Sequence, residues 1–149
     1  KFIAVGINMK NIEYQIKTIN DYAFIEAKLL GSVRNESWNL FIEEIIENCH
    51  HAKSLYLLID ENNQVSEIDF YTIQDLIDKS LVTHFDEVIL SFATKDPIKV
   101  TLERLFHDMA EIAEVPLRVT FHRTMKDAAS LIKNFCLKCE ATMFPNQKS

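Results

Sequence analysis

Hydrophobic residues gather in two short segments near the start of the chain, separated by polar residues. The segments, Ile12–Ile19 and residues 22–30, are rich in residues that favour β-strands and meet at Asn20-Asp21. A polar junction of two residues is typical of a hairpin turn, although its second residue is not the favoured glycine. Gly31 then marks the end of the second segment. The pattern predicts an antiparallel β-hairpin.

The spacing of the hydrophobic positions changes after Asn35. Apolar residues now recur three and four positions apart, and glutamates occupy the opposite positions. This periodicity is that of an amphipathic helix with one buried face. The apolar positions are Trp38, Phe41, Ile42, Ile45, Ile46 and Cys49.

Short apolar runs and helical periodicity alternate through the rest of the chain. Apolar runs at residues 54–59, 87–92 and 117–121 predict buried strands. Helical spacing predicts helices over residues 68–81, from Pro97 and from Thr124. The residues that predict helix N-termini are Ser66 with Asp69, Asp96 before Pro97, and Thr124 with Asp127.

The predicted order is therefore β-β-α-β-α-β-α-β-α. Strands that alternate with helices pair in parallel, so we expect an α/β fold whose mixed sheet opens with the antiparallel hairpin. We expect one domain over residues 1–137 and a flexible tail over residues 138–149. The β-rich opening KFIAVGI either covers its own sheet or pairs with the edge of another chain. Ligands of such folds bind at the carboxyl ends of the strands.

Charge and cysteine content narrow the class of protein. A net charge of −6 argues against a nucleic-acid partner, because phosphate binding requires clustered Lys and Arg. No apolar run approaches the roughly 18 residues that span a bilayer. The opening segment has no small-residue cleavage motif and is a poor signal peptide. Three cysteines without framework spacing fit reduced thiols, so we expect a cytoplasmic protein.

Residue patterns that would support catalysis or metal binding are weak. Asp60 at a strand end, with Thr94-Lys95 after the next strand, has the form of a phospho-receiver site, but the acidic pair that holds magnesium in receivers is missing. The scattered histidines lack the spacing of a zinc helix, and two glycines cannot make a phosphate loop. Cys136 and Cys139 form a C-x-x-C at a helix end, which we interpret as incidental thiols. We predict no catalytic residue, metal or cofactor.

The segment LYLLIDENNQVSEIDFYTIQDLI, residues 55–77, carries a resemblance to a known family. A strand that ends in Asp60, a loop, and then Ile68-Asp69 at a helix start resemble the signature of STAS domains, the fold of bacterial anti-sigma-factor antagonists. The likeness extends to STAS-like proteins of undefined role that are related to the lipid-carrying CRAL-TRIO fold. It covers residues 13–135 and implies both the fold and the place of an interaction surface.

The chain departs from that family where the antagonists are switched. Their aspartate is followed by a phosphorylatable serine, whereas Asp69 is followed here by Phe70, Tyr71 and Thr72. Tyr71 or Thr72 would be the alternative phosphate acceptor, favoured near a helix N-terminus, and the other interpretation is a plain first helical turn. The resemblance implies a non-enzymatic regulatory module that docks a protein partner through Asp60 and residues 69–72.

Two other functions stay open. Ten phenylalanines suggest an apolar-ligand or lipid site, although a filled core explains them as well. The residues that would line such a pocket are Phe70, Phe85, Phe92, Phe106 and Phe121. An enzyme would require a deep polar cleft that unites His122, Asp60 and Lys95. Oligomeric state is open, and a homodimer is one expectation.

Overall fold

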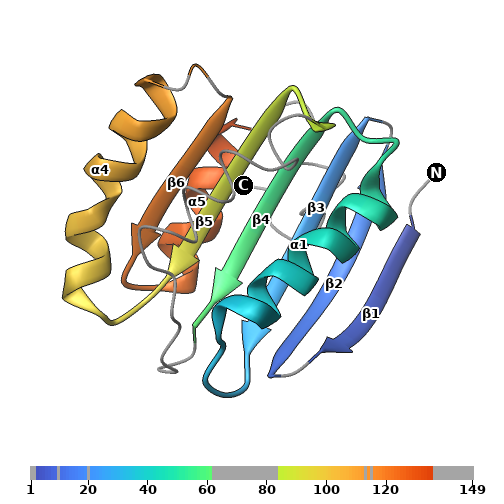
Figure 1. Ribbon diagram of the computed structural model, residues 1–149, viewed down its shortest axis with the longest axis horizontal. Helices are drawn as coiled ribbons and strands as arrows, with labels where there is room; N and C mark the ends of the chain where they lie inside the picture. Colours follow the sequence, from blue (N-terminus) through green and yellow to red (C-terminus); the bar gives the residue numbers. More distant parts are fainter. Residues whose placement is uncertain are drawn as a thin grey trace.

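One mixed β-sheet organises the molecule. The computed structural model describes residues 3–9, 11–19, 21–61, 84–112, 114 and 116–135, and within these residues six strands form a single sheet (Figure 1). Their order across the sheet is also their order in the chain: β1 (Ile3–Met9), β2 (Ile12–Ile19), β3 (Tyr22–Leu29), β4 (Ser54–Asp60), β5 (Glu87–Ala93) and β6 (Leu117–His122). The first three strands are antiparallel, and β3 to β6 are parallel.

The first strand is an addition to the predicted order. The segment that opens the chain forms β1 and pairs with β2, from Ile3 opposite Thr18 to Met9 opposite Ile12. The segment therefore stays with its own sheet, which it extends as the outermost described strand on this side. The predicted hairpin is the β2–β3 pair, and the sheet begins as a three-stranded meander.

Gly31 has a steric role at the end of that meander. A side chain at this position would begin 2.9 Å from Cγ of Asn11, which is too close for two carbon atoms. Asn11 adopts φ 70°, a left-handed conformation that asparagine tolerates well, in the turn between β1 and β2. Its amide donates to the Ser32 carbonyl at 3.0 Å, and its carbonyl accepts from the Leu30 N–H at 2.7 Å. A side chain at residue 31 would therefore displace the Asn11 side chain and its hydrogen bond to Ser32.

Three helices cover the sheet on opposite faces. Figure 1 shows α1 (Asn35–Cys49) and α4 (Pro97–Ile112) in front of the sheet and α5 (Met125–Phe135) behind it. The predicted caps are confirmed: the Asp96 carboxylate accepts from the Ile98 N–H at 2.9 Å, and the Thr124 hydroxyl accepts from the Asp127 N–H at 3.1 Å. The helix predicted over residues 68–81, with its Ser66–Asp69 cap, lies outside the described residues.

The pattern of each strand follows from what covers its faces. Both faces of β4 are covered, so its five central residues are all buried and the sequence reads as one apolar run. Strand β2 instead alternates, with Ile12, Tyr14 and Ile16 in the core and Glu13 and Gln15 exposed. The larger core lies between the sheet and α1 with α4, and the smaller one lies under α5.

A side chain of α4 binds one backbone N–H on the outer side of the edge strand β6. The carboxylate of Glu103 accepts a hydrogen bond of 2.7 Å from the backbone N–H of Phe121. An open strand edge attracts other chains, and a charged acceptor on the edge amide counters this.

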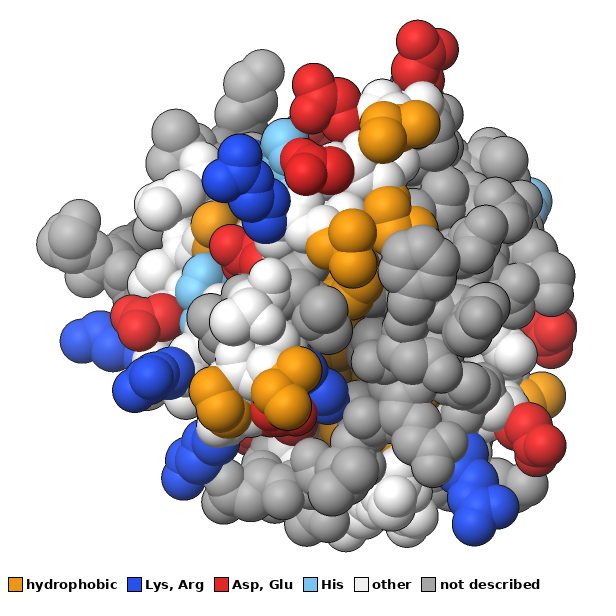
Figure 2. Space-filling model, turned by 60° about the vertical axis from the view of Figure 1, so that its left-hand side comes forward, with side chains coloured by type: hydrophobic (Ala, Val, Ile, Leu, Met, Phe, Trp, Pro, Cys, Tyr) orange, Lys and Arg blue, Asp and Glu red, His pale blue; other side chains and the backbone are white. Residues whose placement is uncertain are grey.

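No helix in the described part of the chain is both long and apolar enough to cross a membrane. Figure 2 turns the α4 side toward the reader and shows hydrophobic side chains exposed among charged ones.

Candidate functional site

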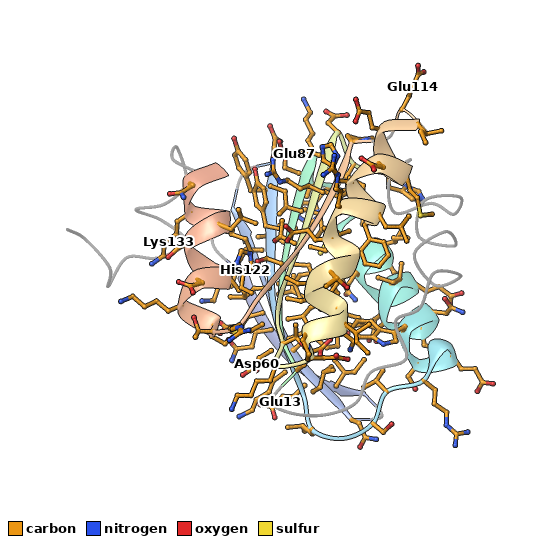
Figure 3. All side chains as sticks on the ribbon, turned by 90° about the vertical axis from the view of Figure 1, so that its left-hand side faces the viewer. Glu13, Asp60, Glu87, Glu114, His122 and Lys133 are labelled. Atoms are coloured by element: carbon orange, nitrogen blue, oxygen red, sulfur yellow. The ribbon has the colours of Figure 1, made fainter. Side chains whose placement is uncertain are left out.

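The carboxyl ends of the parallel strands meet at one edge of the sheet, as the sequence predicted for this fold class. Asp60 ends β4, Ala93 ends β5 and His122 ends β6, and the register places these three residues side by side. Figure 3 labels Asp60 and His122 together with Glu87, which lies at the opposite end of the sheet. We call Asp60 and the residues that directly follow β4, β5 and β6 the carboxyl edge.

Two hydrogen bonds continue the ladder beyond the strands. The Glu61 N–H donates to the Ala93 carbonyl at 3.1 Å, and the Thr94 N–H donates to the His122 carbonyl at 2.7 Å. These bonds hold the first residue of each loop in line with the neighbouring strand. Glu61 and Thr94 are therefore fixed in position relative to the strand ends.

A buried ion pair joins the same loops to α4. The Lys99 ammonium lies 2.9 and 3.1 Å from the two carboxylate oxygens of Glu61, and the Thr94 hydroxyl donates to that carboxylate at 2.7 Å. Only 2% of Glu61 and 7% of Lys99 is exposed. The Thr94 oxygen also accepts from the Asp96 N–H at 3.1 Å. We call Glu61, Thr94 and Lys99 the buried polar cluster.

The buried polar cluster fixes geometry more than it adds stability. Removing two charges from water costs several kcal/mol per ion, which the attraction between them offsets only when the contacts are close and complete. The three residues come from the end of β4, the end of β5 and the first turn of α4. Their contacts therefore set the position of α4 relative to both strand ends.

A hollow of about 270 Å³ opens at the carboxyl edge. Exposed Lys95 and Arg123 lie on its wall, and the start of α5 closes one side. Positive side chains next to a helix N-terminus attract carboxylate or phosphate groups. The residues that line it are Asp60, Ala93, Thr94, Lys95, Arg123, Thr124 and Met125.

A second hollow, of about 250 Å³, lies on the other side of Asp60. Asp60 and Met125 line both hollows, so the two share a wall. The rest of its lining comes from β2 and β3, namely Glu13, Tyr14, Gln15, Glu26, Ala27 and Lys28. Acidic side chains are more frequent here than in the first hollow.

The structure places only some of the predicted site residues. Asp60 lies at the carboxyl edge, while Asp69, Phe70, Tyr71 and Thr72 lie outside the described residues. Asp60 and Lys95 both line the first hollow, as the enzyme alternative requires, but His122 does not. Its imidazole Nε2 lies 3.0 Å from the Thr120 hydroxyl instead.

The phenylalanines of the predicted apolar pocket behave as core residues where the structure describes them. Phe85, Phe92, Phe106 and Phe121 are all buried, and Phe70 lies outside the described part. The rings of Phe92 and Phe121 stack at 5.1 Å, and those of Phe106 and Phe121 lie 5.7 Å apart. Neither hollow is lined by a phenylalanine. The geometry favours the filled-core interpretation.

Sequence reasoning missed the buried polar cluster. Charged residues are expected on the surface, so neither Glu61 nor Lys99 was selected. One signal was available: Lys99 lies seven residues before Phe106, which puts it on the buried face of α4. A lysine on a buried helical face requires a buried partner.

Other titratable groups lie away from the carboxyl edge. Burial raises the pKa of the Cys49 thiol to about 12, so this cysteine is neutral and unreactive in the fold. Burial, and then the hydrogen bond to Glu87 at 2.7 Å, raise the pKa of Tyr56. Cys136 and Cys139 lie outside the described residues.

One group of possible metal ligands occurs in the described part of the chain. His107, Asp108 and Glu111 place their ligand atoms within 4.8 Å of one another on α4. All three side chains are exposed, and acidic groups on helix surfaces commonly lie this close without an ion. The sequence analysis had not selected them.

Comparison with known proteins supports the fold. No protein-family model matches the chain, and a search of curated proteins finds no match. Among solved structures, an uncharacterized protein of the DUF3478 family from Shewanella loihica PV-4, which has a SpoIIAA-like fold, matches with a TM-score of 0.51. The match covers 85% of this chain and 98% of that one at 15% identity. This chain has a SpoIIAA-like fold. The STAS-like fold predicted from the sequence is therefore confirmed, and at this identity the likeness concerns the fold alone.

Proposed function

We propose that this chain is a STAS-like regulatory module that binds a protein partner at its carboxyl edge. The observation that carries the proposal is the hollow there, where Lys95 and Arg123 are exposed above the buried polar cluster. The segment that the family resemblance assigns to partner binding, Asp69 to Thr72, follows β4 in the chain, and β4 ends at this same edge. The described surface and the predicted one would form one docking site.

Preorganisation supports a binding role for this edge. A surface that is rigid before binding loses little conformational entropy when a partner docks. The two ladder bonds and the buried polar cluster hold Glu61 and Thr94, the first residues after β4 and β5, while Lys95 and Arg123 are exposed. Their charge suits an acidic segment or a phosphorylated side chain on the partner. Charged groups at the rim chiefly speed association and select the partner.

Charge reversal tests the proposal. The double variant Lys95→Glu with Arg123→Glu should lose a partner that the wild-type chain captures, because the edge would then repel acidic groups. The matched control is Lys53→Glu, an equally exposed lysine next to the start of β4 at the opposite end of the sheet. Partners would be identified by mass spectrometry after capture from cells of the source organism, with circular dichroism to confirm folding. The same partners on both variants would overturn the proposal.

The predicted half of the site has its own test. Asp69→Asn and Tyr71→Phe each remove one functional group with little change in volume. Loss of the partner that the Lys95→Glu, Arg123→Glu variant also loses would join the two surfaces into one site. Loss in the edge variant alone would limit docking to the carboxyl edge and refute the role of residues 69–72.

A further inference from the structure

Helix α4 carries a line of exposed hydrophobic side chains that belong to neither hydrophobic core of the described residues. Ile98 is 67% exposed, Leu105 40% and Ile112 84%. They are spaced seven residues apart, which is close to two helical turns, so they form one line along the helix. Figure 2 shows hydrophobic side chains following the α4 side of the molecule. We call these three residues the α4 stripe.

The α4 stripe is separate from the buried face of the helix. Phe106 and Ala110 are buried in the larger core and Lys99 in the polar cluster, and each lies about a quarter of a turn or more around the helix from the stripe. Half-buried Met109 lies between the two faces. Large apolar side chains in a line on a surface commonly mark an interface with another protein.

We propose that the α4 stripe binds the α4 stripe of a second copy of this chain, with the two helices antiparallel. A two-fold axis beside Leu105 brings this residue against its own counterpart. The same axis brings Ile98 of each copy against Ile112 of the other, because these positions are equally distant from Leu105. Every member of the stripe thereby gains an apolar neighbour, as a symmetric dimer requires.

The charges beside the stripe favour this arrangement. Arg104 and Asp108 are both exposed and lie on one flank of the stripe. In the antiparallel pair, Arg104 of each copy lies near Asp108 of the other, which gives two opposite-charge contacts around the axis. A symmetric parallel pair would instead place this flank of the two copies on opposite sides of the helix pair, so neither contact could form. Charge complementarity thus selects a second copy in the antiparallel direction.

The ends of α4 point to the same orientation. The last turn of the helix has no basic residue and carries exposed Glu111, followed by exposed Glu114. Negative side chains at a helix C-terminus are unfavourable next to the negative end of the dipole. An antiparallel neighbour places its positive N-terminal end beside these glutamates and offsets the repulsion.

The position of α4 in the fold leaves it open to a neighbour. The helix lies at the β6 side of the sheet, at the margin of the molecule (Figure 1). On that margin, Glu103 already binds the Phe121 amide of the edge strand. Helix pairing is therefore better suited to this side than extension of the sheet. The inference does not depend on the partner proposed for the carboxyl edge, because the stripe and its flanking charges lie outside that hollow.

Analytical ultracentrifugation over a range of concentrations tests the inference on the full chain. We expect the wild type to form a concentration-dependent dimer, and Leu105→Glu to raise its dissociation constant by about 100-fold, the effect of losing a central contact. Leu40→Glu is the matched control, because Leu40 is 45% exposed on α1, outside the stripe. A wild type that stays monomeric at millimolar concentration would overturn the inference, since the stripe would then be covered within one chain or left free. Equal dissociation constants for the Leu105→Glu and Leu40→Glu variants would overturn it too.

Charge reversal tests the orientation. Arg104→Asp and Asp108→Arg should each weaken the dimer about ten-fold, because each places like charges opposite one another. The double variant restores both opposite-charge contacts and should return to within about three-fold of the wild type. Singles that weaken the dimer without rescue in the double variant would refute the antiparallel pairing.

Discussion

Loss of the cation from the buried polar cluster should destabilise the whole fold. In Lys99→Met the side chain keeps its length and loses its charge. The Glu61 carboxylate, 2% exposed, then loses an ammonium group at 2.9 Å while it stays out of water. Breaking a buried pair from one side typically costs about 3–5 kcal/mol, because the remaining carboxylate loses its cation in a medium of low polarity. This is a large part of the about 5–15 kcal/mol that typically holds a domain of this size together.

Replacement of both charges should restore most of that loss. The double variant Glu61→Leu with Lys99→Met replaces both members of this ion pair, and apolar replacements of ion pairs are often neutral or stabilising. The Thr94 hydroxyl loses its acceptor at 2.7 Å, which costs about 1–3 kcal/mol. The double variant should therefore be more stable than Lys99→Met alone.

Urea unfolding followed by circular dichroism measures both effects. With a slope of about 2 kcal/mol per M, a loss of about 4 kcal/mol lowers the midpoint by about 2 M. Lys95→Met is the control, since this exposed lysine on the same loop should change the free energy of unfolding by less than about 0.5 kcal/mol. A shift below about 0.5 M for Lys99→Met, or a double variant no more stable than the single, would refute the role given to the ion pair.

Three further predictions concern other parts of the fold. In a Cys136→Ser, Cys139→Ser background, buried Cys49 should react with Ellman's reagent only on unfolding. Because the pKa of Cys49 is raised from 9 to about 12, its contribution to stability is complete below pH 9 and declines by about 1.4 kcal/mol per pH unit up to pH 12. Urea titrations at alkaline pH should show that Cys49→Val removes this decline. Tyr56→Phe should cost about 0.5–1.5 kcal/mol through loss of its hydrogen bond, and an unchanged unfolding midpoint would contradict this. Glu103→Ala should speed hydrogen exchange at the Phe121 amide and promote aggregation, whereas Glu103→Gln keeps an acceptor for that amide. Equal exchange rates at Phe121 in the two variants would count against protection of the strand edge by Glu103.

Local patterns explain why the sequence predicted most of the fold. The stripe from Trp38 to Cys49 and the caps at Asp96 and Thr124 depend on neighbours within a few residues, and the structure confirms them. Strand β1 was not counted, because a short apolar segment shows no partner from its own sequence. Its pairing with β2 is decided by the turn at Asn11, which the sequence pattern does not distinguish from a loop.

The candidate site was less predictable, because it depends on contacts between residues that are far apart in the sequence. Its location followed from the rule for parallel strands, and Asp60 was selected as a strand end. The contact between Glu61 and Lys99 joins residues 38 positions apart and depends on how α4 returns over the sheet. The α4 stripe was hidden too, because Leu105 and Ile112 read as one face with the buried positions until the structure separated them.

The strand order of the sheet has a consequence for synthesis. Among the six described strands, each pairs with the next one in the chain, from β1 to β6, so none of the six waits for a partner that is encoded beyond the following strand. During translation at about 5–20 residues per second, the β1–β3 meander can form while later strands are still emerging, and the sheet then grows in one direction. Until β6 is added, the growing parallel edge is open to other chains. Arrival of β6, with Glu103 on its edge amide, therefore ends the interval in which a nascent chain is most prone to aggregate.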